Sequence, residues 1–154
     1  MRIKTSDEAE FRFWLTRRYV KLLCPIVLKM LSADQQIARQ EDPSAKSAVL
    51  SFQHEEALQM SDFSTRFNEA SSRLPLGETP VLLAKIQLKR RPDGTSILCM
   101  HPEHGEGIEL SMNKMLLHSF TKLLADAIAA AGWGIEFRIA EKNPTPEGAS
   151  RRMN

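Results

Sequence analysis

The chain has 154 residues, of which 42% are hydrophobic and 26% charged, and its formal net charge is only +2. These values are typical of a globular domain with its own core, and they exclude a disordered chain and a strong overall attraction to nucleic acid or membranes. Two cysteines are too few for a disulfide framework, and no apolar run reaches the roughly 18 residues of a membrane span.

The N-terminal stretch, MRIKTSDEAEF, contains three acidic residues and no apolar core, so it does not resemble a signal peptide and we expect a reduced, cytoplasmic protein. Within it, Thr5 or Ser6 is placed to cap a helix, and Glu8 follows Thr5 at the spacing of a capping box. We therefore predict that a first helical region begins here and takes in residues 11–31.

The central part of this region is unusually apolar. Residues 19–31 are apolar except for Lys21, Pro25 and Lys29. A helix of this composition is hydrophobic nearly all round, so it must be covered on more than one side. Pro25 has no N–H donor and clashes with the carbonyl of Lys21, so we expect a kink or a break near Cys24.

A second helix is predicted after Pro43, with Ser44 as its cap. One apolar stripe follows at helical spacing and consists of Val49, Phe52, Met60, Phe63, Phe67 and Ala70. Polar side chains at residues 61–64 favour a break in this stripe, because they compete for backbone hydrogen bonds. The sequence therefore leaves open whether residues 44–74 form one helix or two pieces.

Residues 81–111 predict a meander of three antiparallel strands. The strand-like segments VLLAKIQLKR, TSILCM and IELSM are separated by RPDG and by HPEHGEG. The first of these connections has turn chemistry, because Pro92 presets φ and Gly94 tolerates left-handed geometry.

The clearest helix is predicted between residues 112 and 131, with Ser111 as its cap and Gly132 at its C-terminal end. Its apolar face consists of Leu117, Phe120, Leu124, Ala127, Ile128 and Ala131. After it, WGIEFRIA predicts either a short strand or a return of Trp133 onto the helix. The polar end of the chain, residues 141–154, is predicted to be a flexible tail.

Together these elements predict an α+β fold with N-terminal helices, a three-strand antiparallel meander and a C-terminal amphipathic helix. A single globular domain is expected over residues 1–140. Residues 11–70 of this domain are predicted to be mainly helical, and residues 81–131 to contain the meander and the last helix. The 112–131 helix is the expected partner of the apolar 11–31 region.

The apolar excess of the 11–31 region needs a cover for its second face. One alternative is the predicted 49–70 helix of the same chain, and the other is a second subunit. Covering one large side chain contributes about 1.5–3 kcal/mol, so several together can drive dimerisation. Under the second alternative the interface consists of Trp14, Tyr19, Leu22, Leu23, Ile26 and Met30.

One short stretch, CMHPEHGE, concentrates side chains that can bind metals, namely Cys99, His101, Glu103, His104 and Glu106. Cys99 and His101 share one face of the predicted strand. The paired C-x-x-C spacing of a closed zinc site is missing, so a solvated turn beside a buried cysteine is the favoured interpretation. We expect no metal and no other cofactor, although the sequence leaves open whether the 99–106 group binds one.

The two remaining histidines do not form a catalytic motif either. His54 lacks the second histidine of an H-E-x-x-H helix and is expected to be exposed, and His118 lies beside an apolar stripe and is expected to be half-buried and hydrogen-bonded. Nucleophile-elbow, P-loop and dinucleotide-binding motifs are absent from the sequence. We therefore expect a protein that is not an enzyme.

Charge is unevenly distributed: the net charge is +4 over residues 1–39, −4 over 40–79 and +2 over 80–154. The first two segments are expected to pair, within the fold or between chains. Two groups of basic residues could also contact phosphates. One is Arg17, Arg18 and Lys21 on the first helix, and the other is Lys89, Arg90 and Arg91 at the hairpin tip. An interfacial membrane helix needs a wet face, and the 11–31 region has little of one, so burial in protein is the favoured interpretation.

The sequence thus favours a non-catalytic intracellular interaction or assembly subunit, such as an adaptor. We expect it to self-associate through the apolar N-terminal helix, most simply as a homodimer. The alternative is a nucleic-acid-binding protein that uses the two basic groups.

Overall fold

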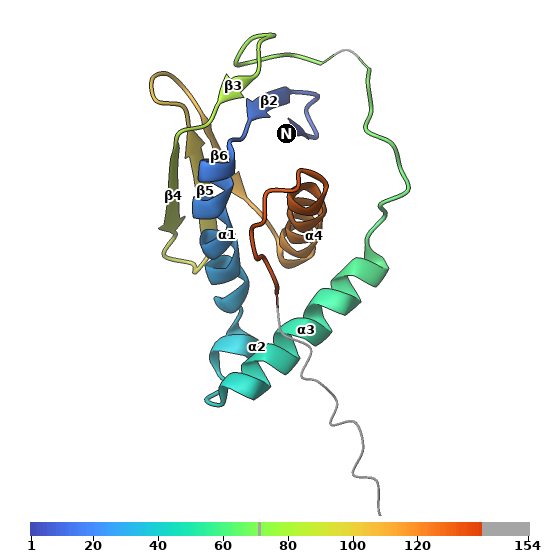
Figure 1. Cartoon of the computed structure of the whole chain (residues 1–154), viewed down its shortest axis with the longest axis vertical. Coiled ribbons are helices and arrows are strands. Elements are labelled where there is room, and N and C mark those ends of the chain that lie inside the picture. The colour runs from blue at the N-terminus through green and yellow to red at the C-terminus, as the bar shows by residue number, and fades with distance from the viewer. Residues whose placement is uncertain (71, 140–154) are drawn as a thin grey trace, which may run out of the picture.

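The structure, a computed structural model, describes residues 1–70 and 72–139. In these residues the chain forms four helices and two three-stranded sheets, so the fold is α+β as expected (Figure 1). One sheet has the strand order β1–β2–β3 and the other β4–β5–β6. The predicted N-terminal helices, antiparallel meander and C-terminal helix are all present.

The chain begins with a β-hairpin where we predicted a helix cap. β1 (Arg2–Lys4) and β2 (Glu10–Trp14) are antiparallel, and β2 also pairs in parallel with β3 (Val81–Leu82). The predicted cap at Thr5 or Ser6 is wrong, because the residues on either side of this stretch pair as antiparallel strands. The Thr5 hydroxyl instead donates to the carbonyl of Ala9 at 3.1 Å, within the turn of the hairpin.

Helix α1 (Arg17–Ser32) contains the apolar run. The hydroxyl of Thr16 caps it by accepting from the N–H of Tyr19 at 3.1 Å. The predicted break near Cys24 is wrong, since α1 continues through Pro25. Pro25 and Lys21 are both exposed, so the carbonyl that loses its donor lies on the side of the helix that faces water.

Two further helices follow, α2 (Gln35–Ala38) and α3 (Pro43–Met60). The cap of α3 is Asp42, which accepts from the N–H of Ala45 at 2.7 Å, and the prediction of Ser44 is therefore wrong. Pro43 occupies the first helical position, where its missing N–H costs nothing.

Helix α3 ends at Met60, so the predicted stripe does not continue as one helix. The carboxylate of Asp62 accepts from the backbone N–H groups of Ser64 and Thr65, which forms a turn there. The stripe itself is wrong: α3 buries Leu50, Gln53 and Ala57, whereas Phe52 and Met60 are 67% and 68% exposed.

The meander is confirmed as β4 (Lys85–Arg90), β5 (Ser96–His101) and β6 (Ile108–Ser111). Gly94 adopts φ of 87° in the first turn, the left-handed geometry that was expected there. Val81 and Leu82 are not part of the meander but pair with β2, so the first predicted strand is shorter than expected.

Helix α4 (Lys114–Ala130) is capped by Asn113, which accepts from the N–H of Leu116 at 2.8 Å, two residues later than predicted. Gly132 follows it with φ of 62°, as expected for a helix end. Residues 133–139 form no strand, and Trp133 packs on the core, which matches the second alternative for this segment. The predicted tail, residues 141–154, lies outside the described residues.

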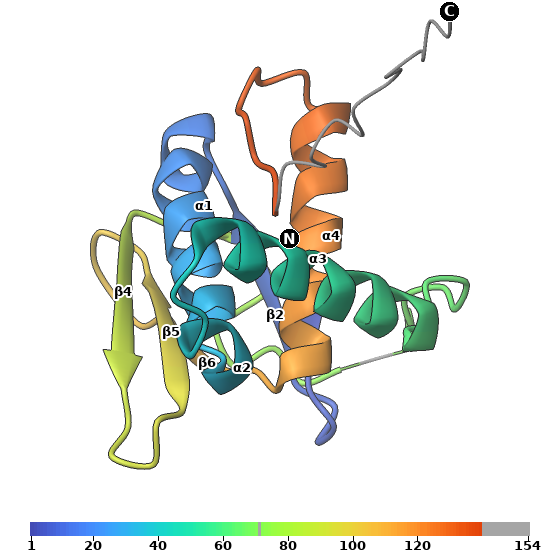
Figure 2. The same ribbon diagram turned by 90° about the horizontal axis from the view of Figure 1, so that it is seen from below.

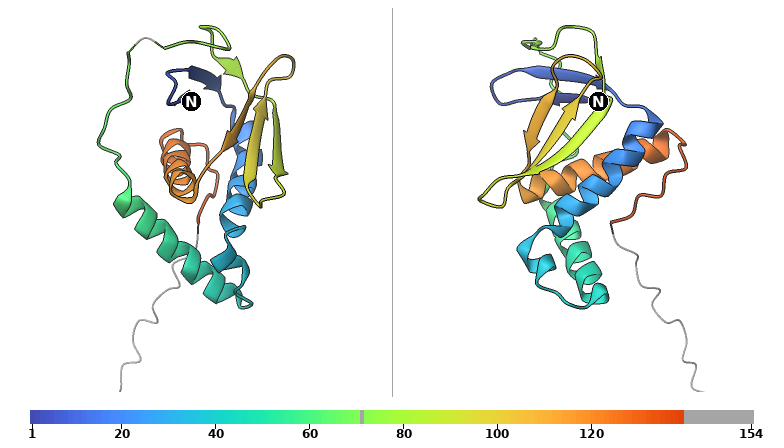
Figure 3. Two further views of the ribbon diagram at one scale, coloured as in Figure 1. Left: turned by 180° about the vertical axis from the view of Figure 1, so that it is seen from behind. Right: turned by 90° about the vertical axis from the view of Figure 1, so that its left-hand side faces the viewer.

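Helix α1 lies between the meander and α4 (Figures 1 and 3). Helix α3 crosses beneath the first half of α4, as the view from below shows (Figure 2). The apolar run of α1 is therefore covered largely within the chain, and its buried residues are Tyr19, Val20, Leu23, Cys24, Val27, Met30 and Leu31. In the part of the chain that the structure describes, none of the helices combines the length and the apolar character needed to cross a bilayer.

Candidate protein-binding groove

An apolar groove of about 410 Å³ separates the N-terminal hairpin from α4. One wall consists of Met1, Arg2, Ile3, Trp14 and Leu15, and the other of Phe120, Leu123, Leu124, Ala127 and Ile128. Val20 and Trp133 complete the lining. Both tryptophans of the chain therefore border this groove.

A second apolar stripe on α4 contributes to the far wall. Leu116, Phe120, Leu123 and Ala127 follow one another at gaps of four, three and four residues, which places them on one helix face, and all but Leu116 line the groove. Leu116 and Leu123 are 53% and 55% exposed, although the adjacent stripe of the same helix is buried in the core. Trp14 on the opposite wall is 63% exposed.

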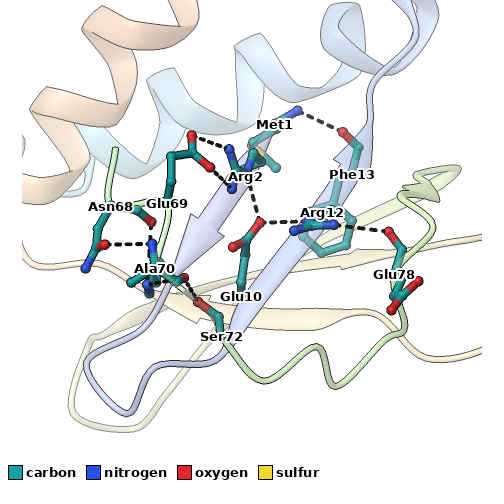
Figure 4. A network of polar contacts seen from close by, with 11 residues as sticks. Met1, Arg2, Glu10, Arg12, Phe13, Asn68, Glu69, Ala70, Ser72 and Glu78 are labelled. Carbon is teal, nitrogen blue, oxygen red and sulfur yellow. Dashed lines mark hydrogen bonds and ion pairs between the residues drawn. The ribbon is translucent and has the colours of Figure 1, made fainter. Parts of the chain in front are cut away.

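Charged side chains hold the hairpin wall in place (Figure 4). The buried carboxylate of Glu10 accepts from Nε of Arg2 at 2.8 Å and from Nε of Arg12 at 2.7 Å. The guanidinium of Arg2 also donates both Nη groups to the carboxylate of Glu69 at 2.9 Å. Hydrogen bonds from the two guanidinium groups hold the pKa of Glu10 at about 2, so it remains ionised.

The same network ties the hairpin to the segment that follows α3. Arg2 lies over the ring of Phe67 at 4.1 Å, and the ammonium of Lys4 donates to the carbonyls of Asn68 and Ala70. The ion pair of Arg2 with Glu69 joins the basic first segment to the acidic second segment within the fold.

The structure places the six residues of the predicted interface in different environments. Tyr19, Leu23 and Met30 lie in the core and Ile26 is half-buried, so these side chains have little or no surface to offer a partner. Trp14 and Leu22 are exposed, but only Trp14 borders the groove. Leu22 lies beside a separate hollow together with Arg18 and Leu83.

The two basic groups lie at different ends of the meander. The hydroxyl of Tyr19 donates to the carbonyl of Lys85 at 3.3 Å, so the start of α1, with Arg17 and Arg18, lies near the start of β4. Arg90 is at the opposite end of that strand. The structure therefore does not bring the groups together in one patch.

Several of these basic side chains also have partners within the fold. Arg17 donates from Nε to the carbonyl of Trp133 at 2.7 Å, and Lys89 pairs with Glu109 at 2.6 Å. Arg90 donates weakly to the carbonyl of Gly94 at 3.5 Å. Arg18, Lys21 and Arg91 are exposed.

The CMHPEHGE stretch does not assemble a metal centre. Cys99 is buried in β5 with its Sγ 3.6 Å from the carboxylate of Glu109, whereas Glu103, His104 and Glu106 are exposed in the turn. Over residues 1–70 and 72–139, no three His, Cys, Asp or Glu side chains are grouped to hold a metal ion. Burial raises the pKa of the Cys99 thiol, which keeps it protonated.

A second hollow of about 490 Å³, with both polar and apolar lining residues, lies between the end of α1, the β4–β5 turn and the start of α4. Lys114 pairs there with Asp34 at 3.5 Å. His118 also lines this hollow, and its Nδ1 lies 3.0 Å from Nδ1 of His54 on α3. His118 is thus more deeply buried than expected, and His54 is half-buried where we expected exposure.

Comparison with known proteins adds no assignment: no model of a protein family matches the chain, and no curated protein or solved structure is significantly similar to it.

Proposed function

We propose that the protein is a non-catalytic interaction or assembly subunit that self-associates through the apolar groove between the N-terminal hairpin and α4. The observation that supports this proposal is the exposure of Trp14 and Leu123 on the two opposite walls of the groove, at 63% and 55%. Burying a fully exposed apolar side chain contributes about 1.5–3 kcal/mol, and these two, already partly covered, gain a part of that each. The docking surface thus shifts from α1, the sequence-based expectation, to α4 and Trp14.

Two properties favour a second copy of the chain as the occupant. A net charge of +2 gives little electrostatic repulsion between copies, so apolar contact is not opposed. The stripe of Leu116, Phe120, Leu123 and Ala127, in which only Phe120 is half-buried, has the alternating four- and three-residue spacing that suits packing against another helix. In a two-fold symmetric pair both copies use this patch, so one substitution acts twice.

Light scattering coupled to size-exclusion chromatography over the micromolar range tests the proposal. We expect a concentration-dependent dimer, and we expect Leu123→Lys to weaken it at least tenfold, which corresponds to about 1.4 kcal/mol. Leu22→Lys is the matched control, because Leu22 is 49% exposed but lies outside the groove. A strict monomer at every concentration, or an equal loss with the control variant, would contradict the proposal.

Nucleic-acid binding through Arg17, Arg18, Lys21 and the 89–91 hairpin tip remains the alternative. It predicts binding to nucleic acid at low salt that weakens as salt rises. Because the two groups lie at opposite ends of β4, neutralising Arg90 and Arg91 together is the informative variant. Binding that is absent at low salt would remove this alternative.

A further inference from the structure

The contact between α3 and α4 depends on few apolar side chains. Helix α3 buries only Leu50, Gln53 and Ala57. Two polar pairs join this region to α4: His54 contacts His118, and the hydroxyl of Ser61, the residue that caps the end of α3, lies 2.7 Å from that of Ser119. Because so little apolar area is involved, these hydrogen bonds carry a large share of the docking of the second half of α3.

The histidine contact restricts how many protons the pair can hold. Nδ1 of His54 and Nδ1 of His118 are 3.0 Å apart, so one proton lies between two nitrogens. Both neutral rings, or one neutral and one charged ring, satisfy this arrangement. When both rings are charged, each Nδ1 carries a proton and neither accepts, and two positive charges then lie on rings with centroids 5.2 Å apart.

We propose that His54 and His118 form an acid-sensitive clamp that fastens the second half of α3 to α4 and opens when both rings are protonated. The part of α3 up to Gln53 remains in place, because Leu50 is buried and Nε2 of Gln53 donates to Asp34 and Gln36 at 3.2 and 2.7 Å. Opening frees the last turns of α3 and uncovers His118 and Ser119 on α4. This clamp is independent of the groove proposed above.

The charged groups around the pair decide the order of protonation. Burial lowers the pKa of His54, and the smaller effects of Glu55 on α3 and Lys122 on α4 oppose each other. His118 faces Lys114 on α4 and Asp34 between α1 and α2, and it is only 1% exposed. His54 therefore takes the first proton. The second proton reaches His118 late, because burial and the charge of His54 lower its pKa to about 4.

A shared metal ion is the other chemistry that two close imidazole nitrogens allow. The surroundings disfavour it, since Lys114 and Lys122 lie near the pair and the described residues supply no third ligand. A hydrogen bond therefore explains the short Nδ1–Nδ1 separation better than a metal does, and added zinc becomes one arm of the test.

Hydrogen exchange of the full chain, normalised to intrinsic rates at each pH, measures the clamp directly. Between pH 7 and pH 4 we expect the protection of amides in residues 54–60 to fall at least tenfold, while α1 keeps its protection. In the double variant His54→Gln/His118→Gln, an amide pair hydrogen-bonds at every pH, so this fall should disappear. The matched control is His101→Gln/His104→Gln, which removes the other two histidines and should keep the fall.

Each outcome of this experiment decides for or against the clamp. Unchanged protection at pH 4, loss that spreads to α1 at the same pH, or a fall that persists in the double variant overturns it. If the double variant does not fold, His54→Gln alone serves, because its amide oxygen accepts from a charged His118. Zinc that protects residues 54–60 at pH 7 in the natural chain, but not in His54→Gln, would show a metal site instead of the clamp.

Discussion

Glu10 and Arg2 are joined across the N-terminal hairpin by a 2.8 Å hydrogen bond, and the Glu10 side chain is only 3% exposed. Arg12 lies two residues along the same strand and donates to the same oxygen at 2.7 Å. A nearly buried carboxylate thus holds two guanidinium groups. Since Arg2 also lines the groove, this pairing fixes the position of one groove wall.

Replacing Glu10 by Gln should lower the thermal midpoint of unfolding at pH 7 more than replacing Glu69 by Gln at the exposed end of the same network. The amide leaves two guanidinium groups without their shared counter-charge. Glu69→Gln is the control, because Glu69 is 71% exposed and solvent screens its ion pair with Arg2. Circular dichroism measures both thermal midpoints. Equal midpoints for the two variants would show that the burial of Glu10 adds nothing to the stability that its ion pairs provide.

The Glu10 carboxylate also predicts a direction for the pH dependence. Its pKa is about 2 in the fold against an ordinary value of 4.5, so the folded protein binds fewer protons than the unfolded chain between these values. The stabilisation is complete above pH 4.5 and is lost as the pH falls toward 2. Urea unfolding at a series of pH values should therefore show a shallower loss of stability in Glu10→Gln than in the natural chain.

The hairpin around Glu10 also shows where reasoning from sequence failed. Phe11 and Phe13 alternate with Arg12 as strand residues do. We nevertheless predicted a helical region over residues 11–31, because of the apolar run at 19–31. The partners that make residues 10–14 a strand are β1 and the distant Val81, which no local pattern reveals. The meander and α4 were predictable because their turns and caps are encoded locally by residues such as Gly94 and Gly132.

The groove could not be predicted from helical periodicity alone. Leu116 and Leu117 are neighbours in the sequence, and each begins an apolar stripe along α4. Only the fold decides that the stripe through Leu117 is buried and the stripe through Leu116 is exposed. Likewise, the contact of His54 with His118 joins residues 64 positions apart, and neither position carries a motif.

Leu23→Ala should destabilise the protein by about 2–5 kcal/mol, whereas Leu22→Ala should cost less than about 1 kcal/mol. The two leucines are adjacent on α1, but Leu23 is 0% exposed and Leu22 is 49% exposed. Urea unfolding of both variants at low protein concentration measures the difference. Similar losses would mean that Leu22 is also covered, and this result would restore α1 as a contact surface.

Gly107→Ala should destabilise the β5–β6 pair by about 1–3 kcal/mol, because a side chain at this position has no room. A Cβ atom would lie 2.0 Å from the carbonyl oxygen of Met100 and 2.7 Å from Cα of His101, so the backbone must move. Glu106→Ala is the control in the same turn, since Glu106 is exposed. Hydrogen exchange in β5 should rise in the first variant and stay unchanged in the second.

Both thiols should be unreactive toward a disulfide reagent such as Ellman's reagent while the protein is folded. Cys24 and Cys99 are 5% and 1% exposed, and burial raises the pKa of each thiol, so neither access nor thiolate is available at pH 7. In urea both should react at once, which provides the control for total thiol content. Rapid reaction of Cys99 in the folded protein would mean that β5 opens readily. It would also favour a chemical role for the CMHPEHGE stretch, because a reactive thiol needs both access and a populated thiolate.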